Sequence, residues 1–318
     1  MKLKKSAVKK GLTTTFVYIL RYAFFISLSY ILLYPFLYII ANALKSFSDA
    51  YDATVTWVPK TFYLGNLRDA FGVFDIKHTA MRSFVYEIIA ALIQFCSCAV
   101  AAYGLARFKL KGKGILTALM IINILVPAMM IITPSYVNFS NFDIFGIFGL
   151  ISKIIGKPIK INFIGTPLVF WLPSLLGVGL KGGLFIYIYS QFFKGLPKEL
   201  EEAAWIDGAG AWKTFLRIVV PSSGSATITV LLFSVVWHWN DHYLANMYMN
   251  DNTFATSISN FSAYRIADTL GIDIERANML TVPIILAGCF LFILPMVIFY
   301  LLIQRKFMAS IATSGIVG

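Results

Sequence analysis

Few side chains in this 318-residue sequence are of types, and at spacings, that could carry out chemistry. The most suggestive cluster is His238, Asp241 and His242, in which the two histidines are four residues apart and would share one helix face. A histidine pair at that spacing can bind zinc, but the neighbouring sequence offers no further ligand beside this cluster, and structural zinc sites hold four. The cluster therefore favours polar residues at an interface, and we predict no metal site.

Nucleotide and redox chemistry have less support still. The phosphate-binding pattern G-x-x-x-x-G-K followed by Ser or Thr does not occur, and Lys113 is followed by Gly114. The three cysteines form no paired C-x-x-C motif. An enzyme would need clustered acids, bases or metal ligands. We therefore predict that the chain is not an enzyme and holds no cofactor of its own.

Lys181 lies near the middle of a predicted membrane span of about 166–192, and Glu87 lies near the outer end of another. Such a charge is a candidate functional group, because it must be paired or face a wet cavity. Two interpretations stay open: Lys181 pairs with Glu87 and supports the structure, or Lys181 lines a polar pathway. Beside it, Gly179 and Gly183 form a G-x-x-x-G pattern, which indicates close helix packing.

The elements that must position these residues are apolar helices. Hydrophobic residues make up 58% of the chain and the mean hydropathy is +0.76, whereas soluble domains are about 45–50% apolar. Six uncharged or nearly uncharged runs are long enough for a transmembrane helix, which needs ~20 residues. They are 22–44, 88–106, 114–141, 161–180, 218–240 and 277–304. The sequence therefore predicts an all-α integral membrane protein with six transmembrane helices.

The formal net charge of +12 lies on one side of this topology. With the N-terminus inside, the inner segments carry all of the excess positive charge, and the outer segments hold equal numbers of basic and acidic residues. The positive-inside rule then places both termini in the cytoplasm. The apolar core of a cleavable signal peptide is ~7–15 residues, so the longer run 22–44 is predicted to be a retained span. Basic residues that flank spans give no support to nucleic-acid binding.

The chain accordingly divides into a cytoplasmic basic arm (1–21), a six-span domain (22–304) and a cytoplasmic tail (305–318). The third span contains Pro127 and Pro134, which would bend a helix or end it early.

A cytoplasmic loop between spans four and five, about 193–221, is unlike its apolar surroundings. It contains the sequence EEAAWIDGAGAWKTFLRIVVP. Asp207-Gly208 is predicted to end a first helix, since Gly readily adopts positive φ. Four apolar residues then recur at i, i+3, i+4 and i+7, which predicts a second, amphipathic helix. They are Trp212, Phe215, Leu216 and Val219. Two short helices at an angle would form a compact knob that fits a partner's groove.

The loop also carries a spaced motif, EAA at 202–204 with Gly208, Ile218 and Pro221 after it. This motif resembles the EAA loop of ABC importer permeases. Further stretches extend the resemblance to the carbohydrate-importer branch, and within it to the six-span, maltose-type second permease subunit. They are AAYGLARF at 101–108, FFKGLPKELEEAAWIDGA at 192–209, WND at 239–241 and the ending at 315–318.

The resemblance implies a type I importer in the bacterial plasma membrane. Two permease subunits form the pathway, two separate ATPase subunits bind ATP and Mg²⁺, and an extracytoplasmic binding protein delivers sugar. The EAA loop is then the coupling element that sits in an ATPase cleft. Its implied residues are Glu202, Ala203, Ala204, Asp207, Gly208, Ala209, Phe215, Ile218 and Pro221. The outer segment 143–165 is longer than in the family, so no loop function is carried over to it.

Four residues are candidates for the translocation pathway: Lys181, Trp239, Asn240 and Asp241. Trp237 and Trp239 also suit an aromatic belt at the outer membrane interface, and the same rings could stack on sugars. A peptide or another small polar nutrient stays open as the cargo. A secondary transporter is a further alternative, but it gives no reason for the EAA spacing, and the chain lacks buried acidic relays for proton coupling.

Overall fold

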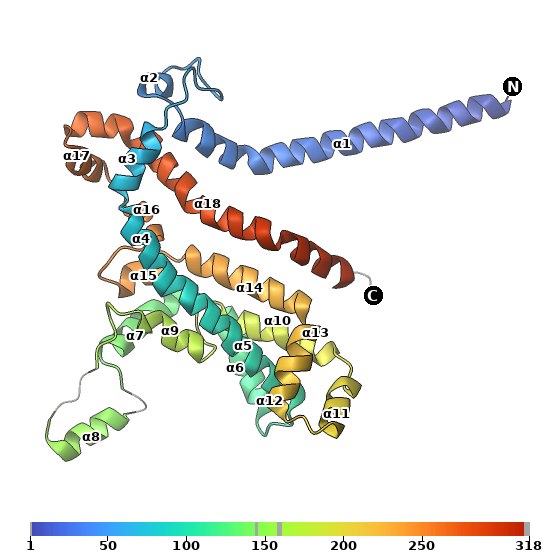
Figure 1. Ribbon diagram of the computed structural model, residues 1–318, viewed down its shortest axis with the longest axis vertical. Helices are drawn as coiled ribbons and strands as arrows, with labels where there is room; N and C mark the ends of the chain where they lie inside the picture. The colour runs from blue at the N-terminus through green and yellow to red at the C-terminus, as the bar shows by residue number, and fades with distance from the viewer. Residues whose placement is uncertain (1, 144–145, 158–160, 315–318) are drawn as a thin grey trace. The chain divides into compact units, whose positions relative to one another are not determined.

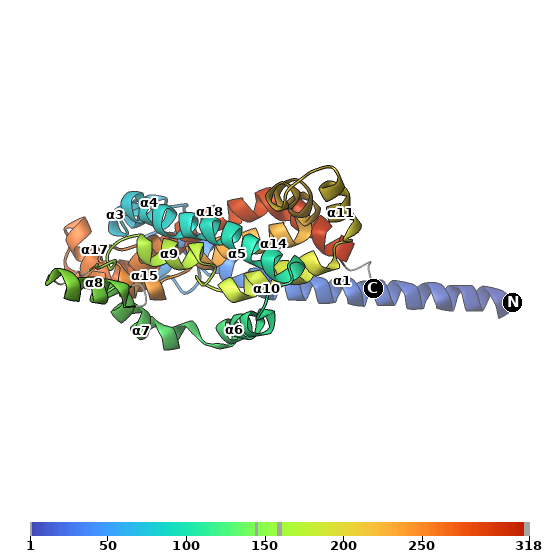
Figure 2. The same ribbon diagram turned by 90° about the horizontal axis from the view of Figure 1, so that it is seen from below.

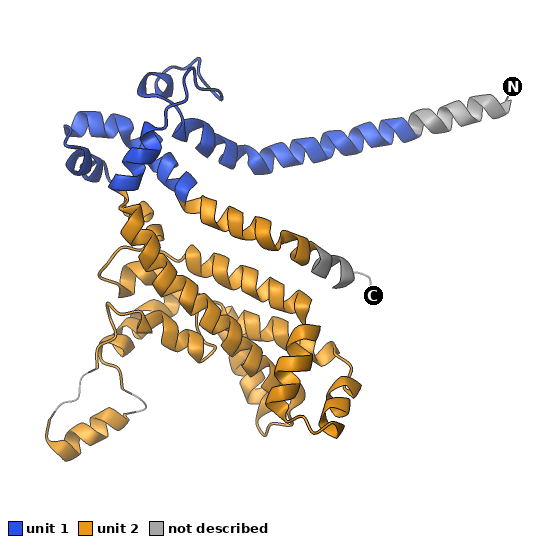
Figure 3. Ribbon diagram, viewed as in Figure 1, with its two compact units in different colours: residues 1–73, 262–291 blue, residues 74–261, 292–318 orange. Residues whose placement is uncertain are grey.

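The computed structural model describes residues 2–143, 146–157 and 161–314, and within these ranges the chain is helical (Figure 1). No strand forms among the described residues; two isolated bridges pair Lys45 with Phe62 and Phe142 with Ile161. The predicted all-α class is confirmed. Contacts divide the chain into two compact units, residues 1–73 with 262–291 and residues 74–261 with 292–318 (Figure 3).

The first unit is dominated by one long helix. Its elements are α1 (Lys2–Ala43), α2 (Phe47–Ala50), α3 (Gly65–Val73), α17 (Ala263–Leu270) and the start of α18 (Ile274–Ser314). Helix α1 runs without a break across the predicted boundary between the basic arm and the first span. Its described side chains up to Ile39 are nearly all exposed, so this stretch is open to lipid or another subunit.

The second unit carries the residues of interest. Its elements are α4 (Ile76–Ser83), η1 (Phe84–Ile88), α5 (Ile89–Arg107), α6 (Lys113–Leu125), α7 (Ala128–Ser140), α8 (Ile147–Ile155), α9 (Leu168–Leu175), α10 (Gly182–Gly195), α11 (Glu199–Ile206), α12 (Ala211–Thr214), η2 (Phe215–Val219), α13 (Val220–Ser222), α14 (Gly224–Trp239), α15 (Tyr243–Tyr248), α16 (Phe254–Ser259) and the rest of α18. The elements η1 and η2 are π-helical turns.

Helix α5 is the centre of this unit and packs against α9, α10 and α14 (Figures 1 and 2). Its buried face is built from small residues, among them Ala91, Cys98 and Ala102, so neighbouring helices approach closely. Helix α10 fills the space with large rings, including Phe185 and Tyr189, which are also fully buried. This core holds the ends of the helices that lead to the loop 193–221.

Among the described residues, three helices are long and apolar enough to cross a membrane: Thr14–Ala43, Ile76–Arg107 and Ile274–Met308. Two bent pairs raise the number to five if each counts as one span. The helix axis bends by 106° between α6 and α7, and by 85° between α12–α13 and α14. The first bend falls at Pro127, which confirms that proline interrupts the third apolar run.

The prediction of one continuous helix over 161–180 is wrong. Helix α9 ends at Leu175 and α10 begins at Gly182, so a break separates them within the predicted fourth span. Gly177 has φ +72° and Lys181 has φ +60°. Both values are left-handed, and a right-handed helix cannot continue through them.

The G-x-x-x-G pattern therefore does not lie on one helix. Gly179 is in the break and Gly183 is in α10. Close packing is nevertheless real at Gly183, where an added Cβ would come within 2.9 Å of the Met120 carbonyl oxygen in α6. The glycine thus permits α6 to approach α10 closely.

Candidate functional site

The loop 193–221 folds as two short helical segments that turn at Gly208. Three glutamates lie in the first turn of α11, where the helix dipole favours negative charge. Gly208 has φ +75°, which confirms the predicted turn. The amide of Ala209 donates to the carbonyl of Ala204 at 2.9 Å and closes the helix end.

The second segment corrects the predicted amphipathic pattern. Phe215 and Val219 are buried, but Trp212 and Leu216 are 63% and 60% exposed. The segment passes from α12 into the π-helical turn η2, so the helical spacing of 3.6 residues per turn does not hold across it. Two of the four apolar side chains therefore face the core and two face outward.

The loop presents a mixed surface. Of the predicted coupling residues, Glu202, Ala203, Asp207, Gly208 and Pro221 are exposed, Ala204 and Phe215 are buried, and Ala209 and Ile218 are half-buried. Large apolar side chains stand among the exposed ones, with Trp205 and Ile206 at 50% and 87% exposure beside Trp212 and Leu216. Several large exposed apolar side chains on one short loop are typical of a surface that another protein covers.

A buried ion pair attaches the loop to α5. Arg107 Nε lies 3.3 Å from Glu201 Oε1, and the two side chains are 6% and 5% exposed. Arg107 Nη2 also donates to the carbonyl of Leu196 at 2.6 Å. Nearby, the rings of Tyr103 and Phe215 pack at 5.0 Å. The end of α5 therefore clamps the start of α11 and the π-helical turn together.

The sequence contained only a weak signal for this clamp. Arg107 belongs to the stretch AAYGLARF and Glu201 directly precedes the EAA motif, so both residues lie in segments that carry the family resemblance. The two residues are far apart along the chain, so the sequence gives no reason to pair them. The EAA motif points to the neighbouring Glu202 instead.

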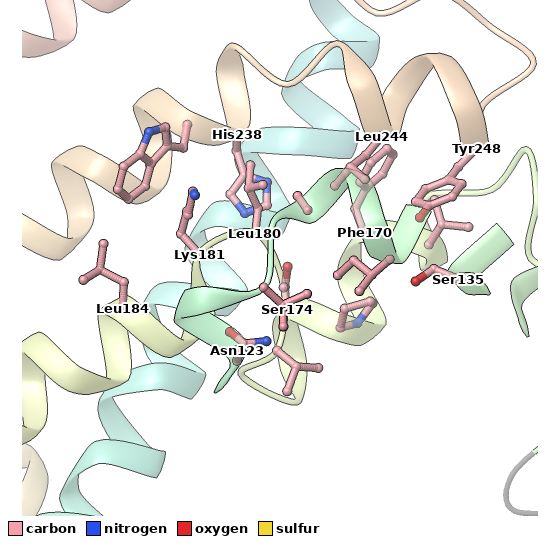
Figure 4. Close-up of a pocket in the computed structure, with 18 of the residues that line it drawn as sticks. Asn123, Ser135, Phe170, Ser174, Leu180, Lys181, Leu184, His238, Leu244 and Tyr248 are labelled. Atoms are coloured by element: carbon pink, nitrogen blue, oxygen red, sulfur yellow. The ribbon is translucent and has the colours of Figure 1, made fainter. Parts of the chain in front are cut away.

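A cavity of about 230 Å³ lies where α9 and α10 separate (Figure 4). It is bounded by the break itself, by the bent pair α6–α7, and by the ends of α14 and α15. Polar lining comes from Asn123, Ser174 and Lys181, and aromatic lining includes Trp237 and Tyr248. The ammonium of Lys181 lies 5.8 Å from the centre of the Trp237 ring. The cavity thus combines one cation, a few hydrogen-bonding groups and ring faces.

Polar side chains from α5 and α14 hold one wall of the cavity. Glu87 Oε2 lies 3.2 Å from His238 Nδ1, and His238 Nε2 lies 2.8 Å from Gln94 Oε1. Gln94 Nε2 donates to the carbonyl of Leu180 at 2.6 Å. The structural alternative that paired Glu87 with Lys181 is therefore wrong, because the carboxylate is bound to His238 and the ammonium faces Trp237.

The remaining predicted pathway residues lie away from the cavity. Trp239 is buried, stacks on Phe292 at 5.6 Å and donates to the Phe292 carbonyl at 3.1 Å. Asn240 is exposed, and Asp241 Oδ1 accepts from the amide of Leu244 at 3.1 Å. Burial raises the pKa of Asp241 to about 6. Of the four candidates, Lys181 alone lines this cavity in the described part of the chain.

Comparison with known proteins identifies the family. Residues 97–309 match the model described as "Binding-protein-dependent transport system inner membrane component". The chain belongs to this family. It is therefore a membrane component of a binding-protein-dependent transport system, and the predicted ABC permease resemblance is confirmed.

Individual relatives of this permease cover almost its whole length. It is 27% identical to the "Probable starch degradation products transport system permease protein AmyC" of Thermoanaerobacterium thermosulfurigenes, over 92% of this chain and 94% of that protein. It is also 27% identical to the "Melibiose/raffinose/stachyose import permease protein MelC" of Bacillus subtilis, over 89% and 91%.

A solved structure shares the fold. It is a bacterial ABC transporter involved in the import of the acidic polysaccharide alginate, and one of its chains matches with a TM-score of 0.66 at 16% identity. The match covers 91% of this chain and 95% of that chain. The fold is thus that of an ABC importer permease.

Proposed function

We propose that the chain is the permease subunit of an ATP-driven importer for a sugar or oligosaccharide and forms half of its translocation pathway. The names of the two relatives support this cargo, since both act on saccharides or starch products. The proposal favours sugar over a peptide or another polar nutrient. A second permease subunit would complete the pathway, and an extracytoplasmic binding protein would deliver the cargo.

The proposed topology has six spans with both termini in the cytoplasm. The three long helices, the bent pair α6–α7 and helix α14 supply five of the spans. The segment 211–222, which bends away from α14, belongs to the cytoplasmic loop. The sixth is assigned to α9 and α10 together, with the break between them inside the bilayer. Irregular backbone is tolerated at that depth where it lines a cavity, and residues 178–181 of the break line one here. The basic residues on the inner side support the orientation.

The observation that carries the coupling proposal is the clamped loop 193–221. Its exposed surface, with Glu202 and Gly208 among protruding apolar side chains, suits a cleft in a separate ATPase subunit that binds ATP and Mg²⁺. The Arg107–Glu201 pair would transmit a displacement of that surface into α5. The loop would then couple hydrolysis to rearrangement of the spans.

The test is transport by the reconstituted complex. The chain, its partner permease and the ATPases in lipid vesicles should take up a binding-protein-delivered oligosaccharide only when ATP is supplied. Uptake without ATP, or driven by an ion gradient alone, would contradict the proposal. Cysteine labelling from outside in whole cells should reach residues placed at 250–270 and fail to reach Lys213→Cys. Outside labelling at position 213 would reverse the topology.

A further inference from the structure

Lys181 occupies an unusual backbone position. Its φ of +60° is left-handed, and Asp75 is the only other non-glycine with positive φ among the described residues. That conformation imposes steric strain on a lysine, which has a Cβ, and not on a glycine. Such outliers concentrate at binding and functional sites, where the surrounding structure enforces them. The surroundings here are tight, because an added Cβ at the next residue, Gly182, would overlap the carbonyl of Gly177.

The charge of Lys181 has no acidic partner in the described part of the chain. The residues that line the cavity include no Asp or Glu, and the nearby carboxylate of Glu87 is bound to His238. The ammonium lies over the Trp237 ring, 5.8 Å from its centre. A cation–π contact at that distance offsets little of the cost of holding a cation inside a membrane protein. The cavity is therefore positive and lacks a counter-charge.

The other walls of the cavity suit a saccharide. The rings of Trp237 and Phe170 offer apolar faces, and Asn123, Ser135 and Ser174 offer hydrogen-bonding groups. Pockets for small ligands typically combine an apolar lining with a few placed polar groups. Figure 4 shows Lys181, Asn123 and Ser174 at the same cavity, with the lysine on the segment between α9 and α10.

From this combination, and resting on the proposed sugar-importer function, we propose that Lys181 binds a carboxylate of the cargo. The substrate class would then be acidic oligosaccharides that contain uronic acid residues. A single ammonium matches the single negative charge of a carboxylate. A phosphorylated sugar would bring about −1.5 to −2 charges, which one lysine leaves partly uncompensated. The competing explanation for the open cation is an acidic side chain of the partner permease, and the experiment separates the two.

The experiment measures uptake by the complete transporter in lipid vesicles with its binding protein and ATP. The probes are a galacturonic acid trisaccharide and its carboxyl-reduced, neutral counterpart. The variants are Lys181→Met and Lys181→Arg, with Lys77→Met as the control, since Lys77 is an exposed lysine in α4. The binding protein is the same throughout, so a difference among variants arises in this chain.

Lys181→Met should lower uptake of the uronic acid probe about tenfold or more, and leave uptake of any neutral saccharide that the wild type transports within about twofold. Lys181→Arg should retain most uptake of the acidic probe, because it keeps the charge. Lys77→Met should behave as the wild type.

Three results would overturn the inference. One is that the wild-type transporter takes up neutral saccharides but not the acidic probe. Another is unchanged acidic uptake in Lys181→Met. The third is an equal loss of all uptake, or loss of the partner permease on purification, which would assign Lys181 to a structural pair between subunits. Absence of ATP-dependent uptake of every saccharide would instead refute the proposed function itself.

Discussion

The loop 193–221 and the α9–α10 break both turn the chain at a residue with positive φ, yet different forces hold the two turns. At Gly208 the residue type suffices, because glycine adopts φ +75° without strain and nothing lies within 4 Å of where a Cβ would be. At Lys181 the residue type opposes the turn. Tertiary contacts impose it instead, through Gln94 on the Leu180 carbonyl and Asn123 on the Gly183 amide.

This difference fits two separate tasks. A turn that is encoded locally and surrounded by open space leaves its surface free for another protein. A turn that is enforced by hydrogen bonds from side chains of α5 and α6 gives a cavity wall of fixed shape. The comparison predicts that substitutions around the break disturb the whole unit, whereas substitutions at the Gly208 turn act mainly on docking.

The largest effect is expected where the loop joins the core. Arg107→Met should lower the free energy of unfolding by about 3 kcal/mol or more, because it leaves the Glu201 carboxylate buried and unpaired. The measurement is denaturant unfolding of the purified complex in detergent. Lys109→Met is the control, since Lys109 is an exposed lysine two residues along. Adding Glu201→Met to Arg107→Met should recover part of the lost stability. Equal losses of stability in Arg107→Met and Lys109→Met would exclude the clamp.

The next effect concerns the break. Gly182→Ala should cost about 2 kcal/mol, because its Cβ would overlap the Gly177 backbone and force the turn to shift. Gly195→Ala, at the other end of α10, has open space around the new Cβ and should be close to neutral. Thermal unfolding of both variants in detergent provides the comparison. A Gly182→Ala protein as stable as Gly195→Ala would show that the break is not tightly packed.

A smaller loss is expected at Gln94. Gln94→Leu removes the donor to the Leu180 carbonyl and the partner of His238, which should cost about 1–2 kcal/mol. Gln191→Leu makes the same change at an exposed position of α10 and is the matched control. If the two variants unfold at the same temperature, the polar network does not hold the cavity wall.

The smallest effect is expected at the open turn. Gly208→Ala should cost about 1 kcal/mol of stability, the strain of a left-handed alanine. Gly210→Ala should cost less, because Gly210 has an ordinary φ of −73° and equally open surroundings. A drop at Gly208 as large as that of Gly182→Ala would contradict the distinction between the two turns.

The sequence predicted the features that depend on local composition. Apolar runs gave the all-helical class, Pro127 gave the bend between α6 and α7, and Asp207-Gly208 gave the turn of the loop. The spaced EAA motif led to the family that the comparison confirmed. Each of these signals lies within a few residues of the structure it specifies.

The features that the sequence missed depend on residues far apart in the chain. The break at Lys181 needs Gln94 and Asn123, and the clamp joins Arg107 to Glu201. Hydropathy treats 161–180 as one span because most of its residues are apolar. The outward position of Trp212 and Leu216 follows from a π-helical turn, which no periodicity of 3.6 residues anticipates.

The measurement that tests the account most directly is uncoupling at the loop surface. Gly208→Asp adds a charged side chain at the left-handed turn, and Glu202→Lys reverses an exposed charge on α11. Both variants should insert and pair with the second permease, because neither residue is buried. They should co-purify with less ATPase, or hydrolyse ATP without taking up sugar. A full ATPase complement with wild-type sugar-stimulated hydrolysis and uptake in both variants would contradict the assignment of 193–221 as the coupling loop.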